Sequence, residues 1–265
     1  MLGGILCGLA MLATLTFYFF VPTTTLWLIF PITIGFYVAA VLVYFLFIIV
    51  SSLFMISKKP IDRPNPMGRF LITITMEWLM QLFRINVTVK GLEKLPNEPC
   101  VIISNHRSDF DPMTLLAVMK KRHLVYICKA EIMRVPVVGW YLHHAGFIGI
   151  DRKNAMRASR SLITAADEMK RTGVDVGIYP EGTRSKTGKL LRFKTGAFVL
   201  AEKANAPIAV MTTKGTECVT KELFWKRTEI EMEILEVWTP ADIAGVSHND
   251  LAARAQELVE RNLSE

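Results

Sequence analysis

The first 57 residues of this 265-residue chain contain no Asp, Glu, Lys, Arg or His. All 31 basic and all 24 acidic residues follow that stretch. The lack of a basic side chain at the start argues against a secretory signal peptide, which has a basic start and a short apolar core. The chain therefore consists of two different segments, an apolar N-terminal one and a charged remainder.

Cysteine is also scarce, and the spacing that zinc sites use is absent. The four cysteines show no Cys-x-x-Cys pair, which argues against a zinc site and is typical of free thiols in a reducing compartment. No internal repeat and no low-complexity linker occurs. We expect neither a bound metal nor a cofactor.

Two apolar runs fill the charge-free stretch. Leu2–Val21 and Leu26–Met55 are each long enough to cross a bilayer core, and a Pro-Thr-Thr-Thr break at 22–25 separates them. We predict a membrane helical hairpin over residues 1–57. Whether the two helices span the bilayer or dip into one leaflet stays open.

Basic residues follow the hairpin at once. Lys58, Lys59, Arg63 and Arg69 place positive charge beside the second helix, which indicates that this end faces the cytoplasm. We therefore predict an integral protein of the inner membrane with its remainder in the cytoplasm. The net charge of +7 comes without aromatic-basic interleaving or a groove-reading motif, so we expect anionic lipid rather than nucleic acid as its partner.

Residues 58–85 form the next predicted segment, a basic flank and an amphipathic helix. Polar residues recur every four positions, and an apolar stripe lies beside them: Arg69, Thr73, Glu77 and Gln81 against Phe70, Ile74, Trp78 and Leu82. Such a helix lies at the lipid headgroups or packs its apolar side on a globular domain, and the pattern does not distinguish between these two positions.

Residues 86–265 alternate short β-rich runs with helical stretches. The expected strands are Asn86–Lys90, Val101–Ser104, Leu124–Cys128, Phe147–Ile150, Val174–Tyr179, Ile208–Thr213 and Glu229–Val237. The expected helices include Asn154–Arg171, which ends at Gly173, Gly196–Ala204, which ends at Asn205, and a last one that begins after Ser247. This alternation predicts one α/β domain with a single mixed or largely parallel sheet flanked by helices.

The most informative pair of residues is His106 and Asp111, in Ser-Asn-His-Arg-Ser-Asp-Phe-Asp-Pro. A neutral imidazole can take a proton from a hydroxyl, and a carboxylate on its other nitrogen stabilises the imidazolium. A five-residue step on a regular helix would separate the two side chains by about 140°, so the pairing needs a turn. Asp111 before Pro112 is equally typical of a helix N-cap, and Asp109 is a rival partner.

Two other chemistries could use the same histidine. Ser104 and Ser108 flank it, so a Ser-His-Asp nucleophile is an alternative. A metal-dependent phosphohydrolase could use His106 with nearby aspartates and the pair His143 and His144, although adjacent histidines point in divergent directions on a regular element.

A second group of polar residues follows a later strand, in Ile-Tyr-Pro-Glu-Gly-Thr-Arg-Ser. Glu181 can orient a hydroxyl or an arginine, Gly182 permits close approach of backbone to ligand, and Arg184 offers a planar fork of donors for phosphate. Basic residues crowd the positions after it: Lys186, Lys189, Arg192 and Lys194. An anion is the natural expectation, although an exposed basic loop is more often simply solvated.

These blocks together resemble one family. Asn-His-x-x-x-x-Asp, Gly-Phe-Ile-Gly-Ile-Asp-Arg at 146–152 and Pro-Glu-Gly-Thr-Arg-Ser, over about residues 105–210, are similar to the glycerolipid acyltransferases, and among them to the bacterial 1-acylglycerol-3-phosphate acyltransferases. The sequence departs from the family in Ala-Pro-Ile-Ala-Val-Met at 206–211, which lacks a second proline, and in the spacing around Gly149 and Ile150.

The resemblance implies roles for particular residues. It makes His106 the general base and Asp111 its orienting partner. It places the acceptor phosphate at a set of residues from three segments: Lys129, Arg152, Glu181, Gly182, Thr183 and Arg184.

The function implied by the resemblance is acyl transfer from acyl-CoA or acyl carrier protein to the free hydroxyl of lysophosphatidic acid, in phospholipid synthesis. The alternatives are another lysophospholipid acceptor and a non-catalytic protein that binds anionic lipid.

Overall fold

The computed structural model describes residues 1–20, 26–56, 64–152, 154–185, 187–222 and 226–264. It divides into two compact units, Met1–Lys59 and Pro60–Glu265. The predicted break at 22–25, the boundary after residue 57 and the basic residues Lys58, Lys59 and Arg63 lie outside the described residues.

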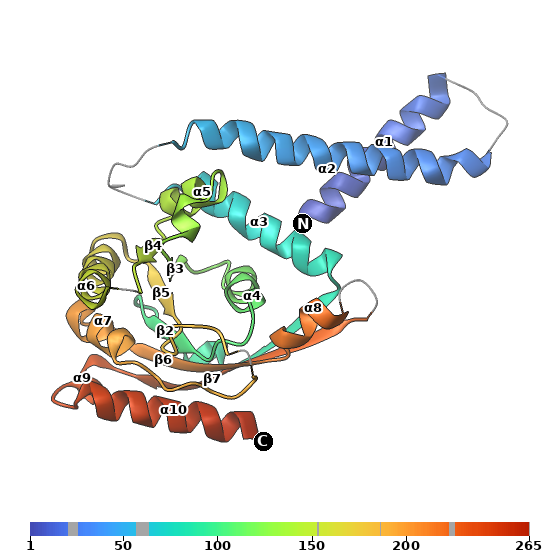
Figure 1. The fold of residues 1–265 in the computed structure, drawn as a ribbon. Helices are drawn as coiled ribbons and strands as arrows, with labels where there is room; N and C mark the ends of the chain where they lie inside the picture. Colours follow the sequence, from blue (N-terminus) through green and yellow to red (C-terminus); the bar gives the residue numbers. More distant parts are fainter. Residues whose placement is uncertain (21–25, 57–63, 153, 186, 223–225, 265) are drawn as a thin grey trace. The chain divides into compact units, whose positions relative to one another are not determined.

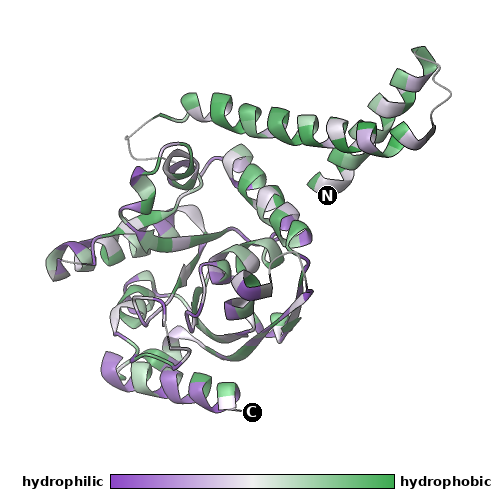
Figure 2. Ribbon diagram, turned by 45° about the vertical axis from the view of Figure 1, so that its right-hand side comes forward, coloured by the Kyte–Doolittle hydropathy of each residue, from purple (hydrophilic) through white to green (hydrophobic). Residues whose placement is uncertain are grey.

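The first unit is a pair of helices, α1 (Leu2–Phe20) and α2 (Ile29–Leu53), with a 3₁₀ turn at Leu26–Leu28. A hydrogen bond of 3.2 Å joins the hydroxyl groups of Thr14, on α1, and Thr33, on α2. Figure 2 shows both helices as hydrophobic along their length. By length and composition both can cross a membrane, since 19 and 25 residues extend over about 28 and 38 Å at about 1.5 Å per residue.

The second unit is built on one seven-stranded sheet, which confirms the predicted α/β class. Its strands are β1 (Ile85–Lys90), β2 (Val101–Ser104), β3 (Leu124–Lys129), β4 (Ile148–Ile150), β5 (Asp175–Ile178), β6 (Ile208–Lys214) and β7 (Thr228–Trp238). Their order is β1-β7-β6-β2-β5-β3-β4, and every neighbouring pair is parallel except β6 and β7. The sheet is therefore mixed, with β2 to β6 running in one direction.

Helices flank this sheet. They are α3 (Pro66–Leu82), α4 (Phe110–Val118), α5 (Val138–His144), α6 (Ala155–Thr172), α7 (Gly196–Ala204), α8 (Val219–Glu222), α9 (Pro240–Ile243) and α10 (His248–Ser264), with 3₁₀ turns at Leu92–Lys94, Ile132–Arg134 and Thr216–Cys218. Figure 1 shows α10 along one side of the sheet and α4 on the other. The predicted stop signals are confirmed, because Gly173 and Asn205 both adopt the left-handed conformation directly after α6 and α7.

Burial follows position in the sheet. All four residues of the central strand β2 are buried, as expected for a strand covered on both faces. In β7 the predicted alternation is confirmed, since Ile230 and Met232 are each 1% exposed while Glu229 and Glu231 face solvent. The apolar core consequently lies along the central strands, and the polar ends of those strands remain available at the sheet edge.

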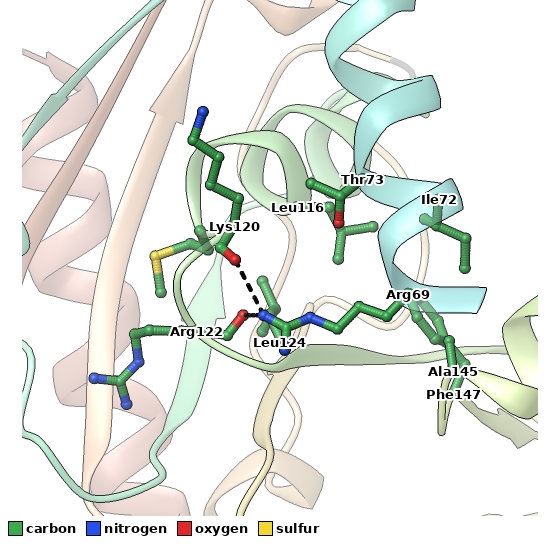
Figure 3. Close-up of a pocket in the computed structure, with 10 residues that line it drawn as sticks. Arg69, Ile72, Thr73, Leu116, Lys120, Arg122, Leu124, Ala145 and Phe147 are labelled. Atoms are coloured by element: carbon green, nitrogen blue, oxygen red, sulfur yellow. Dashed lines mark hydrogen bonds between the residues drawn. The ribbon is translucent and has the colours of Figure 1, made fainter. Parts of the chain in front are cut away.

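Helix α3 packs on the sheet unit partly through its polar side, which carries Arg69 and Glu77. The Arg69 guanidinium donates to the carbonyl oxygens of Lys120, at 3.1 Å, and of Arg122, across a hollow of about 10 Å³ (Figure 3). Glu77 pairs with the Lys120 ammonium at 2.8 Å. Phe70 of the apolar stripe is 48% exposed. The stripe is therefore exposed at its two ends, since Leu82 is 40% exposed as well, and buried at Ile74 and Trp78, which are 8% and 6% exposed.

Candidate active site

The site forms where the parallel strands end. The carboxyl ends of β2 to β6 share one edge of the sheet, the place where open α/β sheets bind ligands. His106 follows β2, Lys129 ends β3, Arg152 follows β4 and Gly182 follows β5. Residues that are far apart in the sequence are brought to one edge by the sheet order alone.

His106 and Asp111 are in contact. The His106 Nδ1 atom lies 2.8 Å from Asp111 Oδ2, and the two side chains are 13% and 1% exposed. The same carboxylate oxygen accepts the backbone N–H groups of Arg107, at 2.7 Å, and Ser108, at 2.8 Å, while Oδ1 accepts the Thr216 hydroxyl. This hydrogen bonding assigns the proton to Nδ1 and leaves Nε2 as the basic nitrogen.

The start of α4 explains how a five-residue step brings the pair together. The helix begins at Phe110, so Asp109 is its N-cap residue and Asp111 lies in its first turn; the expectation of an N-cap at Asp111 is wrong by two positions. The chain before Phe110 is a loop, which turns His106 back over Asp111. The rival Asp109 is 80% exposed and pairs with Arg184 instead.

The imidazole is held by stacking as well as by its hydrogen bond to Asp111. The Tyr179 ring lies parallel to the His106 ring, with centroids 4.2 Å apart and planes 13° apart, and Tyr126 stacks behind Tyr179 at 5.5 Å. Burial raises the pKa of both tyrosines, so both stay neutral. Gly177 makes room for this stack, because a Cβ atom there would collide with the Tyr126 ring.

The Pro-Glu-Gly turn is tied to the histidine loop. Glu181 Oε1 accepts the backbone N–H of His106 at 2.6 Å, Oε2 accepts that of Leu191 at 3.0 Å, and the Ser185 N–H donates to the His106 carbonyl at 3.0 Å. Glu181 is 2% exposed, and burial raises its pKa. The structure thus places this carboxylate on backbone amides, where it fixes the two loops, and not on the cavity described next.

A cavity of about 430 Å³ lies between α6, α7 and the ends of β3 to β5. Its described wall does not include His106 but does include Tyr179, the ring that stacks on the imidazole. Arg152, Tyr179 and Gly182 all line it. The other sequence-predicted phosphate-binding residues lie outside this lining: Glu181 holds backbone amides, Thr183 is exposed, Arg184 pairs with Asp109, and Lys129 pairs with Glu131 at 3.6 Å. The structure therefore brings two of the six predicted residues into the cavity wall and leaves the others around it.

Sequence reasoning missed three supporting residues. Thr216 follows β6 and reaches Asp111 only through the fold, so no local signal marked it. Asn105 pairs its side-chain amide with both backbone groups of Thr213, each at 2.8 Å, which extends the pairing of β2 and β6 by one residue. Tyr179 stands directly before the Pro-Glu-Gly turn, and a large aromatic residue at a strand end next to a candidate site was the available signal.

The alternative chemistries find little support in this geometry. Within the described residues, no group of three or more His, Cys, Asp or Glu side chains gathers to hold a metal ion. The Ser108 hydroxyl accepts the backbone N–H of Phe110 at 3.3 Å and is not among the partners of the His106 ring. The described residues therefore form no Ser-His-Asp relay at His106 and Ser108.

Comparison with known proteins shows similarity to acyltransferases. The model of the acyltransferase family matches residues 86–214. The 1-acyl-sn-glycerol-3-phosphate acyltransferase beta of Homo sapiens is 37% identical over 140 residues, 52% of this chain and 50% of its own length. The 1-acyl-sn-glycerol-3-phosphate acyltransferase of Pseudomonas aeruginosa is 36% identical over 132 residues, 49% of this chain and 51% of its own length.

A solved structure shares the fold. The crystal structure of the 1-acyl-sn-glycerophosphate acyltransferase PlsC from Thermotoga maritima superposes with a TM-score of 0.63 at 24% identity, and covers 83% of this chain and 87% of its own. The chain spans about half or less of the length of the first curated relatives it matches. Residues 86–214, which contain His106, Arg152 and Glu181, therefore match the acyltransferase family.

Proposed function

We propose that this protein transfers a fatty acyl group from an acyl thioester to the free hydroxyl of lysophosphatidic acid, giving phosphatidic acid. The observation that carries the proposal is the 2.8 Å contact between His106 and Asp111, next to the Tyr179 ring that lines the cavity with Arg152, in a chain whose residues 86–214 match the acyltransferase family. The names of the human and Pseudomonas relatives support the choice of acceptor.

The proposed reaction uses His106 as general base and then as general acid. Nε2 removes the proton from the lysolipid hydroxyl as its oxygen attacks the thioester carbonyl carbon. The tetrahedral intermediate then collapses with cleavage of the C–S bond, and the imidazolium returns the proton to the leaving thiolate. Asp111 stabilises the imidazolium while it exists, so its charge matters most in the transition state. General acid–base catalysis of this kind contributes about 10²- to 10⁴-fold.

The acceptor phosphate is proposed to lie among the cations around the cavity. Arg152 lines the cavity itself. Arg184 and Lys129 each pair with an acid on an exposed part of the surface, Asp109 and Glu131, and a phosphate could replace these acids as the partner. Gly182 and Thr183 come from the same turn, and Glu181 supports them by fixing its position.

The setting of the reaction is proposed to be the inner membrane, with the sheet unit in the cytoplasm. Both the acceptor and the product are lipids, and α1 and α2 are long and apolar enough to cross a membrane. The basic residues after α2 favour the cytoplasmic orientation. The donor is proposed to be acyl-CoA or acyl carrier protein, both of which carry their acyl group as a thioester in the aqueous phase.

A direct assay tests the proposal. The full chain is purified in lipid vesicles, supplied with a panel of lysolipids and with each donor in turn, and its products are identified by mass spectrometry. We expect phosphatidic acid as the main product, loss of its formation in His106→Ala, and retention in His248→Ala, which removes a histidine on α10. Acylation of another lysolipid in preference to lysophosphatidic acid would refute the acceptor assignment, and full activity in His106→Ala would refute the mechanism.

A further inference from the structure

The wall of the 430 Å³ cavity combines apolar side chains with two cations. Its apolar part includes Ile127, Leu162 and Val199, and its charged residues, among those that the structure describes, are Arg152 and Lys194. The volume lies within the range of about 300 to 1,000 Å³ that small-molecule sites occupy. The described lining therefore consists of apolar side chains and two positive charges and contains no acid. Such a lining suits an amphiphilic ligand with an anionic group.

Neither cation has a bonded partner in the part of the chain that the structure describes, and Glu131 acts on Arg152 only through its charge at longer range. The ammonium of Lys194 and the guanidinium of Arg152 form no hydrogen bond or ion pair there, in contrast to the paired Arg184 and Lys129. Arg152 is exposed as a whole residue, and the burial of part of its side chain lowers the pKa of the guanidinium. An anion in the cavity would satisfy both groups together.

Lys194 is directed to this place by Gly182. Gly182 closes the turn with a left-handed φ of +71°, and a Cβ atom there would lie 2.8 Å from Lys194 Nζ and 3.2 Å from its Cε. The Lys194 backbone N–H donates to the Pro180 carbonyl at 2.9 Å, which fixes the start of the side chain. The lysine therefore lies across the open face of the glycine, and any larger residue at 182 has to displace its ammonium.

The start of α7 adds to the positive potential. Helix α7 has nine residues and begins at Gly196, with Thr195 as an N-cap that makes no side-chain capping bond. Thr195, Gly196 and Ala197 all line the cavity. The N-terminal end of a helix favours anions through its unpaired N–H groups and its dipole. This contribution acts together with the two side chains.

We propose that Lys194 is a further substrate-binding residue, which with Arg152 binds a phosphate group of the substrate in this cavity, and that Gly182 serves to admit it. The inference rests on the proposed function. The phosphate belongs to the lysolipid acceptor or to the carrier of the acyl donor, because both carry one. The two sources are separated by measuring the Michaelis constants of both substrates.

The first test is Lys194→Met in the full chain in vesicles. We expect the KM of one substrate to rise about 10-fold or more, with kcat within about 3-fold of the parent, because a hydrogen bond to a charged group is lost. Lys194→Arg should restore much of the affinity. The control is Lys203→Met, which removes an exposed lysine at the end of α7 and should change neither KM.

A second measurement reports on the charge of the ligand. The parent is compared with Lys194→Met on lysophosphatidic acid and on a monoacylglycerol, which lacks the phosphate. If the acceptor phosphate lies at Lys194, the variant loses about 10-fold of its preference for lysophosphatidic acid; if the donor phosphate lies there, the preference is kept and the donor KM rises. A purely structural role of Lys194 would leave both the preference and the donor KM unchanged.

The contact with Gly182 is tested by a double-mutant cycle. Gly182→Ala should raise the same KM as Lys194→Met, and it should raise that KM less when Lys194 is already Met, because the displaced ammonium is then absent. Fully additive effects would overturn the role given to Gly182. If the parent acylates lysophosphatidic acid but Lys194→Met leaves both KM values unchanged, the inference on Lys194 fails; if the parent does not acylate it, the proposed function fails.

Discussion

Replacing Asp111 by asparagine removes one negative charge from the site and little else. Asparagine has nearly the shape of aspartate, and its remaining oxygen can face the three donors that now share Oδ2, namely the His106 ring and the N–H groups of Arg107 and Ser108. Its NH₂ group then faces the Thr216 hydroxyl, which can rotate and accept instead of donating. We therefore expect the loop and the fold to persist.

The magnitude follows from the charge on the imidazolium. Two unit charges about 4 Å apart attract by about 4 kcal/mol at an effective dielectric constant of about 20. The imidazolium forms only during the reaction, so this attraction is lost from the transition state and not from the substrate complex. A loss of about 4 kcal/mol corresponds to a fall of about 10³-fold in kcat. We expect the KM of the acceptor to change less than about 3-fold.

Steady-state kinetics on purified protein in vesicles, with both substrates varied, measures the two constants separately. Thermal unfolding of Asp111→Asn shows whether the fold accommodates the amide, and Asp167→Asn, which changes an exposed carboxylate on α6, provides the matched control. A kcat within about 5-fold of the parent would refute the role of Asp111 in the chemistry. A large rise in KM at constant kcat would instead assign Asp111 to substrate binding.

Three further outcomes are expected. Ser108→Ala should keep most of the activity, because its hydroxyl is not bonded to the His106 ring; stable labelling of Ser108 by an acyl group would contradict direct attack. Burial lowers the pKa of His123, so the unfolded chain binds more protons below about pH 6.5 and the urea midpoint should fall as the pH is lowered through that range; an equally steep fall in His123→Gln would contradict this assignment. Gly177→Ala should destabilise the fold by about 1 to 3 kcal/mol, since its Cβ meets the Tyr126 ring, and an unchanged thermal midpoint would exclude that contact.

Local patterns in the sequence were sufficient for the strands and the longer helices of the fold. The charge-free start predicted two long apolar helices, and alternating β-rich and helical runs predicted seven strands, which the structure places in one mixed sheet. Helix ends such as Gly173 and Asn205 were readable because a left-handed residue stops a helix by its own backbone preference. The sequence predicted α3 as a helix, but it did not predict which side of the helix faces the sheet. That side depends on Arg69, whose partners Lys120 and Arg122 lie far along the chain.

The sequence by itself determined which chemical groups are present and that several of them follow strands. His106 and Asp111 were identified as a pair, but the rival Asp109 could be set aside only when the loop before α4 was seen to turn the imidazole over Asp111. Only the tertiary structure decided the partners that arrive from distant segments, such as Thr216 on Asp111 and Lys194 beside Gly182. Spacing along a chain reports neighbours on one element, whereas the order of strands in a sheet sets which ends meet, and that order depends on how the whole core packs.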